Sequence, residues 1–160
     1  MYIELIKADI TDAEEIRRIQ ALAFAELYER YQDHASSPAN ETVERVTERF
    51  KGIPQDHYIL RLNGENIGSV RVAPLPDNVC YLNSICIVPQ YRGQGLGKLV
   101  MSELEALYPD AKRWELTTIN QEKTLCRFYE MLGYTCLGDY RELQEGMMLV
   151  KYEKILEKEK

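Results

Sequence analysis

Three alternating glycines that follow an apolar run in the middle of the chain form the pattern most suggestive of chemistry. The run covers residues 85–89, and Gly93, Gly95 and Gly97 open a stretch with helical apolar spacing. At a helix start several backbone N–H groups lack an intrahelical partner, and the helix dipole adds about half an elementary positive charge. Glycine permits a tight turn with positive φ and lets an anion approach the amides. The pattern therefore predicts a phosphate site, with Lys98 as an additional positive charge.

Two common phosphate loops fit this segment poorly. A Walker-type loop needs Ser or Thr after its lysine, but Leu99 follows Lys98. A dinucleotide-binding G-x-G-x-x-G motif needs a glycine in place of Lys98 and a strand that opens the fold. A glycine turn that closes a strand–helix junction and binds nothing is the remaining alternative.

The segment and its surroundings resemble the GNAT family of N-acetyltransferases. Residues 92–97 (Arg-Gly-Gln-Gly-Leu-Gly) match the family's Gln/Arg-x-x-Gly-x-Gly/Ala signature, and residues 127–134 resemble its Leu-Tyr-x-x-Leu-Gly-Phe segment. These motifs lie within residues 83–134, and the order of elements is similar over nearly the whole chain. The resemblance implies transfer of an acetyl group from acetyl-CoA to a primary amine by direct attack in a ternary complex. The acceptor would be a small molecule, a peptide, or a protein N-terminus or lysine.

The resemblance also implies where the coenzyme lies. In such enzymes the fourth strand splays from the fifth, and the pantetheine arm pairs with main-chain groups in the gap while the pyrophosphate lies in the glycine loop. Asn120 is a further contact, because relatives place an Asn at the position of Glu122, close to it; Asn120 also fits as a helix N-cap. The expected coenzyme contacts are Cys86, Ile87, Val88, Arg92, Gly93, Gln94, Gly95, Leu96, Gly97, Lys98 and Asn120.

Tyr129 matches the tyrosine that protonates the departing CoA thiolate in this family. A phenol with a reference pKa of about 10 can donate to a thiolate whose thiol has a pKa of about 8.5 only with help from geometry, so hydrogen bonding matters more than full proton transfer. Helical spacing with Phe128 and Leu132 also fits a core aromatic residue.

The general base has no clear candidate in the sequence. Relatives often carry a carboxylate on the fourth or fifth strand, where this chain has Asn83, Ser84 and Thr117. Glu115 shares the face of Thr117 and is a candidate base, acting directly or through water. The alternatives are that Glu115 faces solvent and that the amine loses its proton to solvent or a water chain.

The resemblance places the acceptor pocket at the first two helices and their loop, residues 26–40. Glu26, Glu29, Tyr28 and Tyr31 there supply carboxylates and aromatic faces that suit a cationic amine. The alternative is a solvated helix end.

Composition bounds the remaining possibilities. A net charge of −6 disfavours nucleic acid as a partner, because phosphate neutralisation needs a basic surface. The four cysteines form no CxxC pair, and their spacing from the two histidines suits no zinc site, so we expect no metal. No apolar run is long enough for a membrane span, and residues 1–4 lack signal-peptide features, so we expect a cytoplasmic protein. A homodimer is compatible with this fold, although no sequence pattern specifies one.

Apolar periodicity predicts the elements that position these residues. We expect one α/β (α+β) domain over residues 1–160, with a mixed, mostly antiparallel twisted sheet of six to seven strands flanked by about four helices. The expected helices cover residues 12–27, 41–51, 95–108 and 121–132. The expected strands cover residues 2–8, 57–62, 67–73, 79–88, 113–118, 134–140 and 147–155.

Two other functions stay open on the sequence. A catalytically weak acyl-CoA sensor or interaction module would keep the coenzyme site, and the missing base leaves room for it. A nucleotide-phosphate protein with unrelated chemistry would use the same glycine loop.

Overall fold

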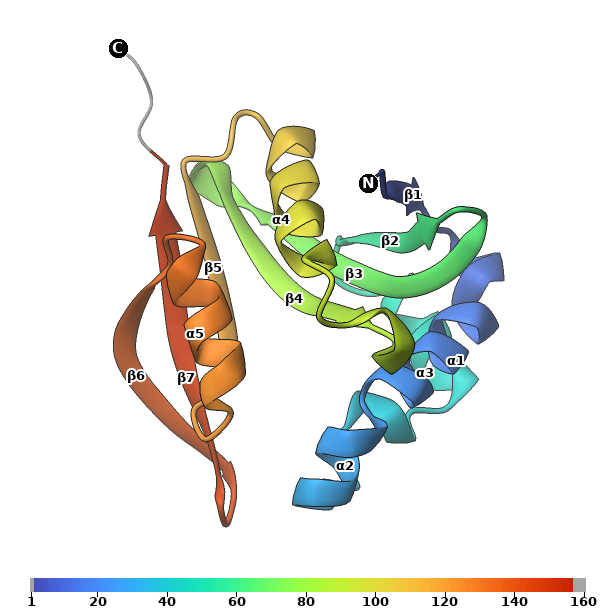
Figure 1. Cartoon of the computed structure of the whole chain (residues 1–160), viewed down its shortest axis with the longest axis horizontal. Coiled ribbons are helices and arrows are strands. Elements are labelled where there is room, and N and C mark those ends of the chain that lie inside the picture. Colours follow the sequence, from blue (N-terminus) through green and yellow to red (C-terminus); the bar gives the residue numbers. More distant parts are fainter. Residues whose placement is uncertain (1, 157–160) are drawn as a thin grey trace.

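The sheet of the computed structural model has seven strands within residues 2–156, the part of the chain that the structure describes (Figure 1). Met1 and residues 157–160 lie outside that part. The strand order is β1-β2-β3-β4-β5-β7-β6, and all neighbours are antiparallel except β4 and β5. The predicted mixed, mostly antiparallel sheet is therefore confirmed. The strands are β1 (Glu4–Lys7), β2 (Asp56–Leu62), β3 (Glu65–Leu75), β4 (Val79–Ile87), β5 (Arg113–Ile119), β6 (Thr135–Gln144) and β7 (Met147–Ile155).

The helices lie on both faces of the sheet. Tyr58 on β2 shares a hydrogen bond of 2.8 Å with the hydroxyl of Tyr108, which follows α4, whereas its neighbour His57 stacks on Phe50 after α3. Because consecutive strand residues point to opposite faces, α3 and α4 cover opposite faces. Within residues 2–156 the α-helices are α1 (Ala13–Ala23), α2 (Ala25–Tyr31), α3 (Val43–Arg49), α4 (Leu96–Leu107) and α5 (Lys123–Met131).

The first predicted helix is broken at Phe24, which explains the fifth helix. Phe24 has φ −102° and ψ 4°, and α2 begins at the next residue. The side chain of Arg92 donates a hydrogen bond to the carbonyl of Ala23, a group that a continuous helix would have used itself. α1 buries five residues, whereas α2 buries none. α2 extends beyond α1 toward the end of the molecule where the β6–β7 hairpin lies (Figure 1).

The core fills the space between the sheet and the helices. Trp114 and Leu116 of β5, Leu60 of β2, and Val100 and Leu104 of α4 are each no more than 1% exposed. Burying such side chains contributes roughly 1.5–3 kcal/mol each, so these residues hold the sheet and α4 as one rigid support.

The sheet splits between β4 and β5. The two strands pair only from Val79 with Arg113 to Leu82 with Leu116. Beyond that point β4 continues with β3, β5 continues with β7, and the two halves diverge (Figure 1). A register shift in the β3–β4 pairing leaves Asn83 as an extra residue just where the split begins. Such a bulge bends a strand and increases its twist, which accounts for the divergence.

Candidate active site

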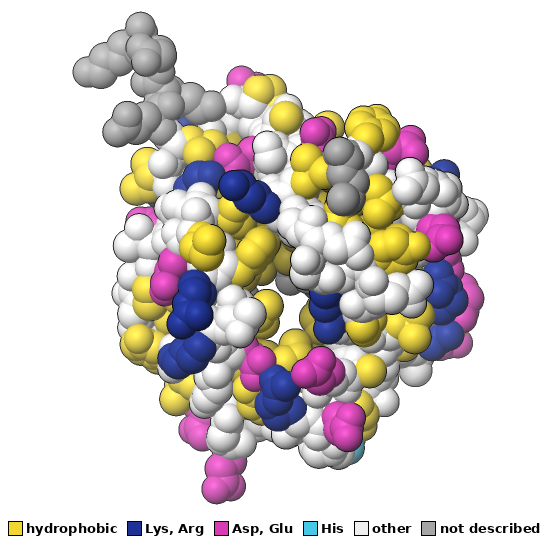
Figure 2. All heavy atoms as spheres, viewed as in Figure 1, with side chains coloured by type: hydrophobic (Ala, Val, Ile, Leu, Met, Phe, Trp, Pro, Cys, Tyr) yellow, Lys and Arg dark blue, Asp and Glu magenta, His cyan; other side chains and the backbone are white. Residues whose placement is uncertain are grey.

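A cavity of about 590 Å³ occupies the split between β4 and β5. Figure 2 shows the molecule hollowed at this place, with acidic and basic side chains around the opening. Its walls come from α1 and α2, the loop that precedes α3, the diverging parts of β4 and β5, α5, and the β6–β7 hairpin. Elements from both ends of the chain therefore meet around one space.

Tyr129 lies on the α5 side of this cavity. The ring is buried against Phe128, Tyr134 and Tyr152, with centroid distances of 5.1, 5.8 and 6.5 Å. Within residues 2–156 its hydroxyl has no hydrogen-bond partner, and burial raises its pKa above the usual value of 10.0. The hydroxyl is therefore protonated at neutral pH and can donate a hydrogen bond. Tyr129 is both a core residue and a residue that lines the cavity.

The end of β4 supplies main-chain groups to the gap. Ile87 faces the gap, and its carbonyl accepts a 2.9 Å hydrogen bond from Arg92 Nε. The N–H of Val88 is not free, because it donates to the Ile67 carbonyl at 2.8 Å. Cys86 is buried with its thiol 3.4 Å from the Ser69 hydroxyl, and burial raises its pKa. Of the three residues expected to offer main-chain groups, Ile87 is the best placed.

The glycine loop has the conformation that its sequence predicts. Gly93 and Gly95 have φ values of 75° and 77°, and Gly95 is the N-cap of α4. A Cβ at either position would meet nothing within 4 Å, so the space in front of both is open. Lys98 is exposed in the first turn of α4, a place where a cation opposes the helix dipole unless an anion binds beside it.

Two residues of this loop make contacts that the sequence did not predict. A Cβ on Gly97 would lie 3.0 Å from the Phe128 ring, so the absence of a side chain allows α4 and α5 to approach each other. The guanidinium of Arg92 is engaged with Ile87 and Ala23, with Glu26 at 3.8 Å. The main-chain N–H of Arg92 is also engaged, because it donates to the Pro89 carbonyl at 3.1 Å. Leu96 is buried in the core, and Gln94 is exposed.

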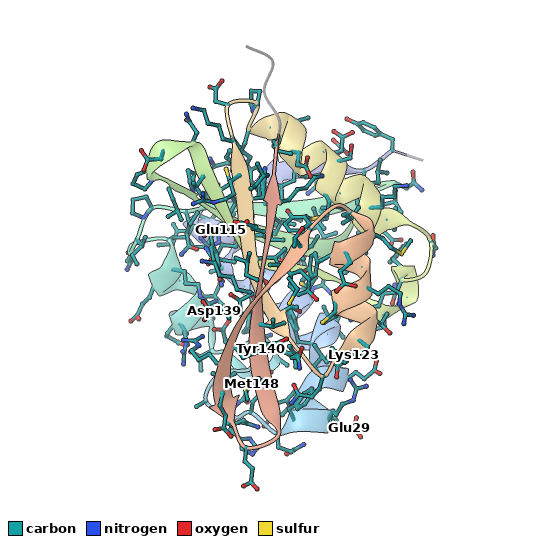
Figure 3. All side chains as sticks on the ribbon, turned by 90° about the vertical axis from the view of Figure 1, so that its left-hand side faces the viewer. Glu29, Glu115, Lys123, Asp139, Tyr140 and Met148 are labelled. Atoms are coloured by element: carbon teal, nitrogen blue, oxygen red, sulfur yellow. The ribbon has the colours of Figure 1, made fainter. Side chains whose placement is uncertain are left out.

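The structure does not bring Glu115 to the cavity. Glu115 lies opposite Tyr81 in the paired part of β4 and β5, and Figure 3 shows it high on β5. Its carboxylate accepts a 2.8 Å hydrogen bond from Arg113 and lies 3.5 Å from Lys151 Nζ. Glu115 does not line the cavity, whereas Thr117 and its neighbours further along β5 do.

Asn120 is also displaced from its expected roles. Its N–H donates to the Met148 carbonyl at 2.7 Å, and it does not line the cavity. The N-cap of α5 is Glu122 rather than Asn120, because the chain makes a turn before the helix begins.

Glu122 joins α2 to α5 across the cavity. Its carboxylate accepts hydrogen bonds from Arg30 at 2.6 Å and Tyr31 at 2.5 Å. Burial raises the pKa of Glu122, but the Tyr31 and Arg30 hydrogen bonds outweigh burial and the net pKa is lowered. Burial and the Glu122 hydrogen bond raise the pKa of Tyr31 to about 12.

The acceptor residues expected on α2 are only partly confirmed by their positions. Glu26 lines the cavity, but Glu29, Tyr28 and Tyr31 do not. Figure 3 shows Glu29 at the far end of α2. Tyr28 bonds to His34, with 2.5 Å between the hydroxyl and Nδ1.

Five charged residues that line the cavity were not identified from the sequence, namely Arg30, Asp33, Glu41, Arg49 and Arg71, and two of them matter most for the chemistry. Asp33 is buried beyond the end of α2, and its carboxylate accepts one hydrogen bond, of 3.5 Å, from Ser36. Arg71 lies on β3 between Val70 and Val72. Because side chains alternate along β3, Arg71 lies on the face of the sheet opposite to that of the core residues Val70 and Val72. The sequence does not show which of the two faces holds the cavity.

Within residues 2–156 no three His, Cys, Asp or Glu side chains are grouped as metal ligands, and no helix of that range is long and apolar enough to cross a membrane.

Known proteins resemble this chain in sequence and in fold. The model of the acetyltransferase (GNAT) family matches residues 15–134. YrkN of Bacillus subtilis (strain 168) is 31% identical over 100 residues, which cover 61% of this chain and 54% of that protein. This chain therefore spans about half the length of that curated relative.

Solved structures share the fold. An acetyltransferase from Thermus thermophilus superposes with a TM-score of 0.79 at 17% identity, over 98% of each chain. PaiA N-acetyltransferase from Thermoplasma acidophilum, solved in complex with coenzyme A, gives a TM-score of 0.71 at 17% identity, over 98% of this chain and 100% of that chain.

Proposed function

We propose, since this chain belongs to the GNAT family of acetyltransferases, that it transfers an acetyl group from acetyl-CoA directly to a primary amine. The observation that carries the proposal is the split between β4 and β5, with Tyr129 on one wall of its cavity and polar side chains on the other. A cavity that lies between the two halves of the sheet lets the coenzyme and the amine enter from different sides and meet.

The coenzyme fits the side of the cavity formed by the end of β4 and the start of α4. The left-handed Gly93 and Gly95 leave open space in front of the N–H groups at the start of α4, and Lys98 is exposed in the first turn of that helix. Ile87 would contribute its N–H to the pantetheine arm. When bound, acetyl-CoA supplies an activated acyl group with a thiolate leaving group.

Tyr129 is our candidate general acid. The Tyr129 side chain is buried at the cavity wall, and its hydroxyl stays protonated at neutral pH and is engaged in no hydrogen bond among residues 2–156. It can therefore donate to the sulfur as the C–S bond breaks. General acid catalysis of this kind contributes on the order of 100-fold or more to rate.

We infer that Asp33 receives the proton of the attacking amine, directly or through water. Four carboxylates among the described residues line the cavity, but Glu41 and Glu122 each accept hydrogen bonds from at least two side chains, and Glu26 is largely exposed. Asp33 is buried and has one long hydrogen bond. Asp33→Asn should lower kcat at neutral pH by about 100-fold and leave the Kd of CoA unchanged. An unchanged kcat would exclude Asp33 as the base.

The experiment that tests the function measures thiol release from acetyl-CoA with Ellman's reagent across a panel of primary amines, in parallel with calorimetric titration of CoA. Turnover on at least one amine supports the proposal. Tight CoA binding with no turnover on any amine would support an acyl-CoA sensor instead. Absence of CoA binding by folded protein would exclude both.

A further inference from the structure

Arg71 is a cation on the acceptor side of the cavity that has no partner among the described residues. It lies on β3, with His57 of β2 and Ser84 of β4 as its neighbours in the sheet, and it lines the cavity. Its Nε is buried without a hydrogen bond, and none of its guanidinium nitrogens forms a hydrogen bond or ion pair with any residue in the range 2–156.

The surroundings of Arg71 do not neutralise its charge. Glu41 lines the same cavity, but Arg49 forms an ion pair with it and Gln20 donates to it at 2.8 Å. The charge of Arg49 is balanced by Glu41, and the pKa of Arg49 is lowered to about 10 by burial and by the charge of Arg71. His57 next to Arg71 is neutral at pH 7, because burial and the adjacent Arg71 charge lower its pKa to about 4. Arg71 therefore has no ion-pair partner among residues 2–156, in a chain whose net charge is −6.

An unpaired guanidinium in a partly buried position is unfavourable unless an anion pairs with it. The planar fork of arginine matches a carboxylate through two parallel hydrogen bonds. Arg71 and Tyr129 line the same cavity, whose volume of about 590 Å³ is that of a site for a small ligand. One small molecule can therefore reach Arg71 with one end and the β4–β5 gap with the other.

We propose that the acceptor carries a carboxylate, which Arg71 binds beside Arg49, while its primary amine faces the acetyl group in the gap. The acceptor class is then a small amino acid or an amino acid-like amine rather than a polyamine or a protein lysine. This inference rests on the proposed function, and it adds the class of substrate.

The test compares acetylation of L-α-amino acids and of β-alanine with that of the corresponding amides. Four proteins are needed, namely the wild type, Arg71→Met, Arg71→Lys and Arg45→Gln. Arg45 is the matched control, because it lies on the same side of the sheet at Glu41, 3.6 Å away, but is exposed and does not line the cavity. Arg71→Met keeps the apolar volume and removes a charge that has no partner in residues 2–156, so its melting temperature should not fall.

The wild type and Arg45→Gln should prefer acids over amides in kcat/KM. Loss of a charged hydrogen-bonding partner should lower kcat/KM for the acids by about 10- to 100-fold in Arg71→Met and leave the amides unaffected. Arg71→Lys should restore part of the preference. The affinity for CoA should be equal in all four proteins, which would exclude Arg71 as a coenzyme contact.

Equal use of acids and amides by the wild type, or an undiminished preference in Arg71→Met, would overturn the inference and leave the acetyltransferase function intact. Phosphoethanolamine acetylated faster than every amino acid would overturn the carboxylate in favour of a phosphate. If no amine of either kind is acetylated, the proposed function fails. Binding of an amino acid, measured as a shift in melting temperature, then tests whether Arg71 holds a carboxylate. Stabilisation by an amino acid against heat in the wild type but not in Arg71→Met would support the carboxylate site, and equal shifts would overturn it.

Discussion

The two sides of the cavity are built in different ways. The side where we place the coenzyme consists of the end of β4 and the glycine loop before α4, a run of consecutive residues that would act through its main chain. The acceptor side consists of charged side chains from α2, α3 and β3, which are far apart in the sequence. A site made of backbone conformation recognises a constant ligand, and a site made of side chains can be changed one residue at a time to suit another ligand.

Charge separates the two sides as well. The coenzyme side has the exposed cation Lys98 beside open space, and the guanidinium of Arg92 is used to hold α1 against β4. On the acceptor side Glu41 and Glu122 form ion pairs with arginines. Arg71 has no ion-pair or hydrogen-bond partner among residues 2–156. Substitutions on the first side should therefore change coenzyme affinity, and substitutions on the second should change acceptor use or local stability.

The largest effect is expected on the coenzyme side from Gly95→Asp. The new carboxylate would stand where we place the pyrophosphate, and repulsion of about 4 kcal/mol corresponds to roughly a 1,000-fold loss of CoA affinity. Isothermal titration calorimetry measures the loss. Gly146→Asp is the control, since Gly146 also has a positive φ of 82° with nothing within 4 Å but lies in the β6–β7 turn. Equal affinities in the two variants would place the phosphates elsewhere.

Tyr129→Phe should have the next largest effect and should spare binding. Removing the hydroxyl removes the proposed donor to the thiolate, so kcat should fall about 100-fold while the Kd of CoA stays within about twofold. Tyr134→Phe is the matched control, because Tyr134 packs 5.8 Å from Tyr129 and its hydroxyl is also unpartnered within residues 2–156, but it does not line the cavity. A similar fall in both variants would indicate a packing effect rather than acid catalysis.

His57, the neighbour of Arg71 in the sheet, should make the free energy of unfolding depend on pH. Its folded pKa is about 4, below its ordinary value of 6.5, so between these values the unfolded state binds more protons. The free energy of unfolding should therefore fall as the pH decreases from 7 to 4, by about 3 kcal/mol from this group. Urea denaturation of His57→Gln should show a shallower fall, whereas His34→Gln, at the chain's other and exposed histidine, should follow the wild type.

The smallest effect is expected from Glu122→Gln, which weakens the link between α2 and α5. The Arg30 partner is nearly half exposed, so the loss in stability should be under about 1 kcal/mol. The KM of the amine should rise a few-fold, because α2 would hold its cavity residues less firmly, and CoA affinity should not change. Glu29→Gln, a control on α2 but outside the cavity, should leave the KM of the amine unchanged. A change in CoA affinity would contradict the separation of the two sides.

Local patterns in the sequence predicted the sheet, the glycine loop and the start of α4 correctly. Each depends on neighbouring residues: apolar alternation for strands, and glycines at residues 93 and 95 for left-handed turns. The break at Phe24 was not predicted, because apolar spacing continues through it and the break is stabilised by Arg92, which is remote in the sequence.

The sequence by itself determined the fold class and the conformation of the glycine loop, because both follow from the preferences of adjacent residues. Only the tertiary structure decided which charges meet in the cavity. It placed Glu115 in the paired part of the sheet beside Arg113, gave Glu41 to Arg49, and left Arg71 facing the cavity without a partner in the described part of the chain. The energy of a charge depends on its burial and on its partners, and both are set by contacts between elements that the order of residues does not reveal.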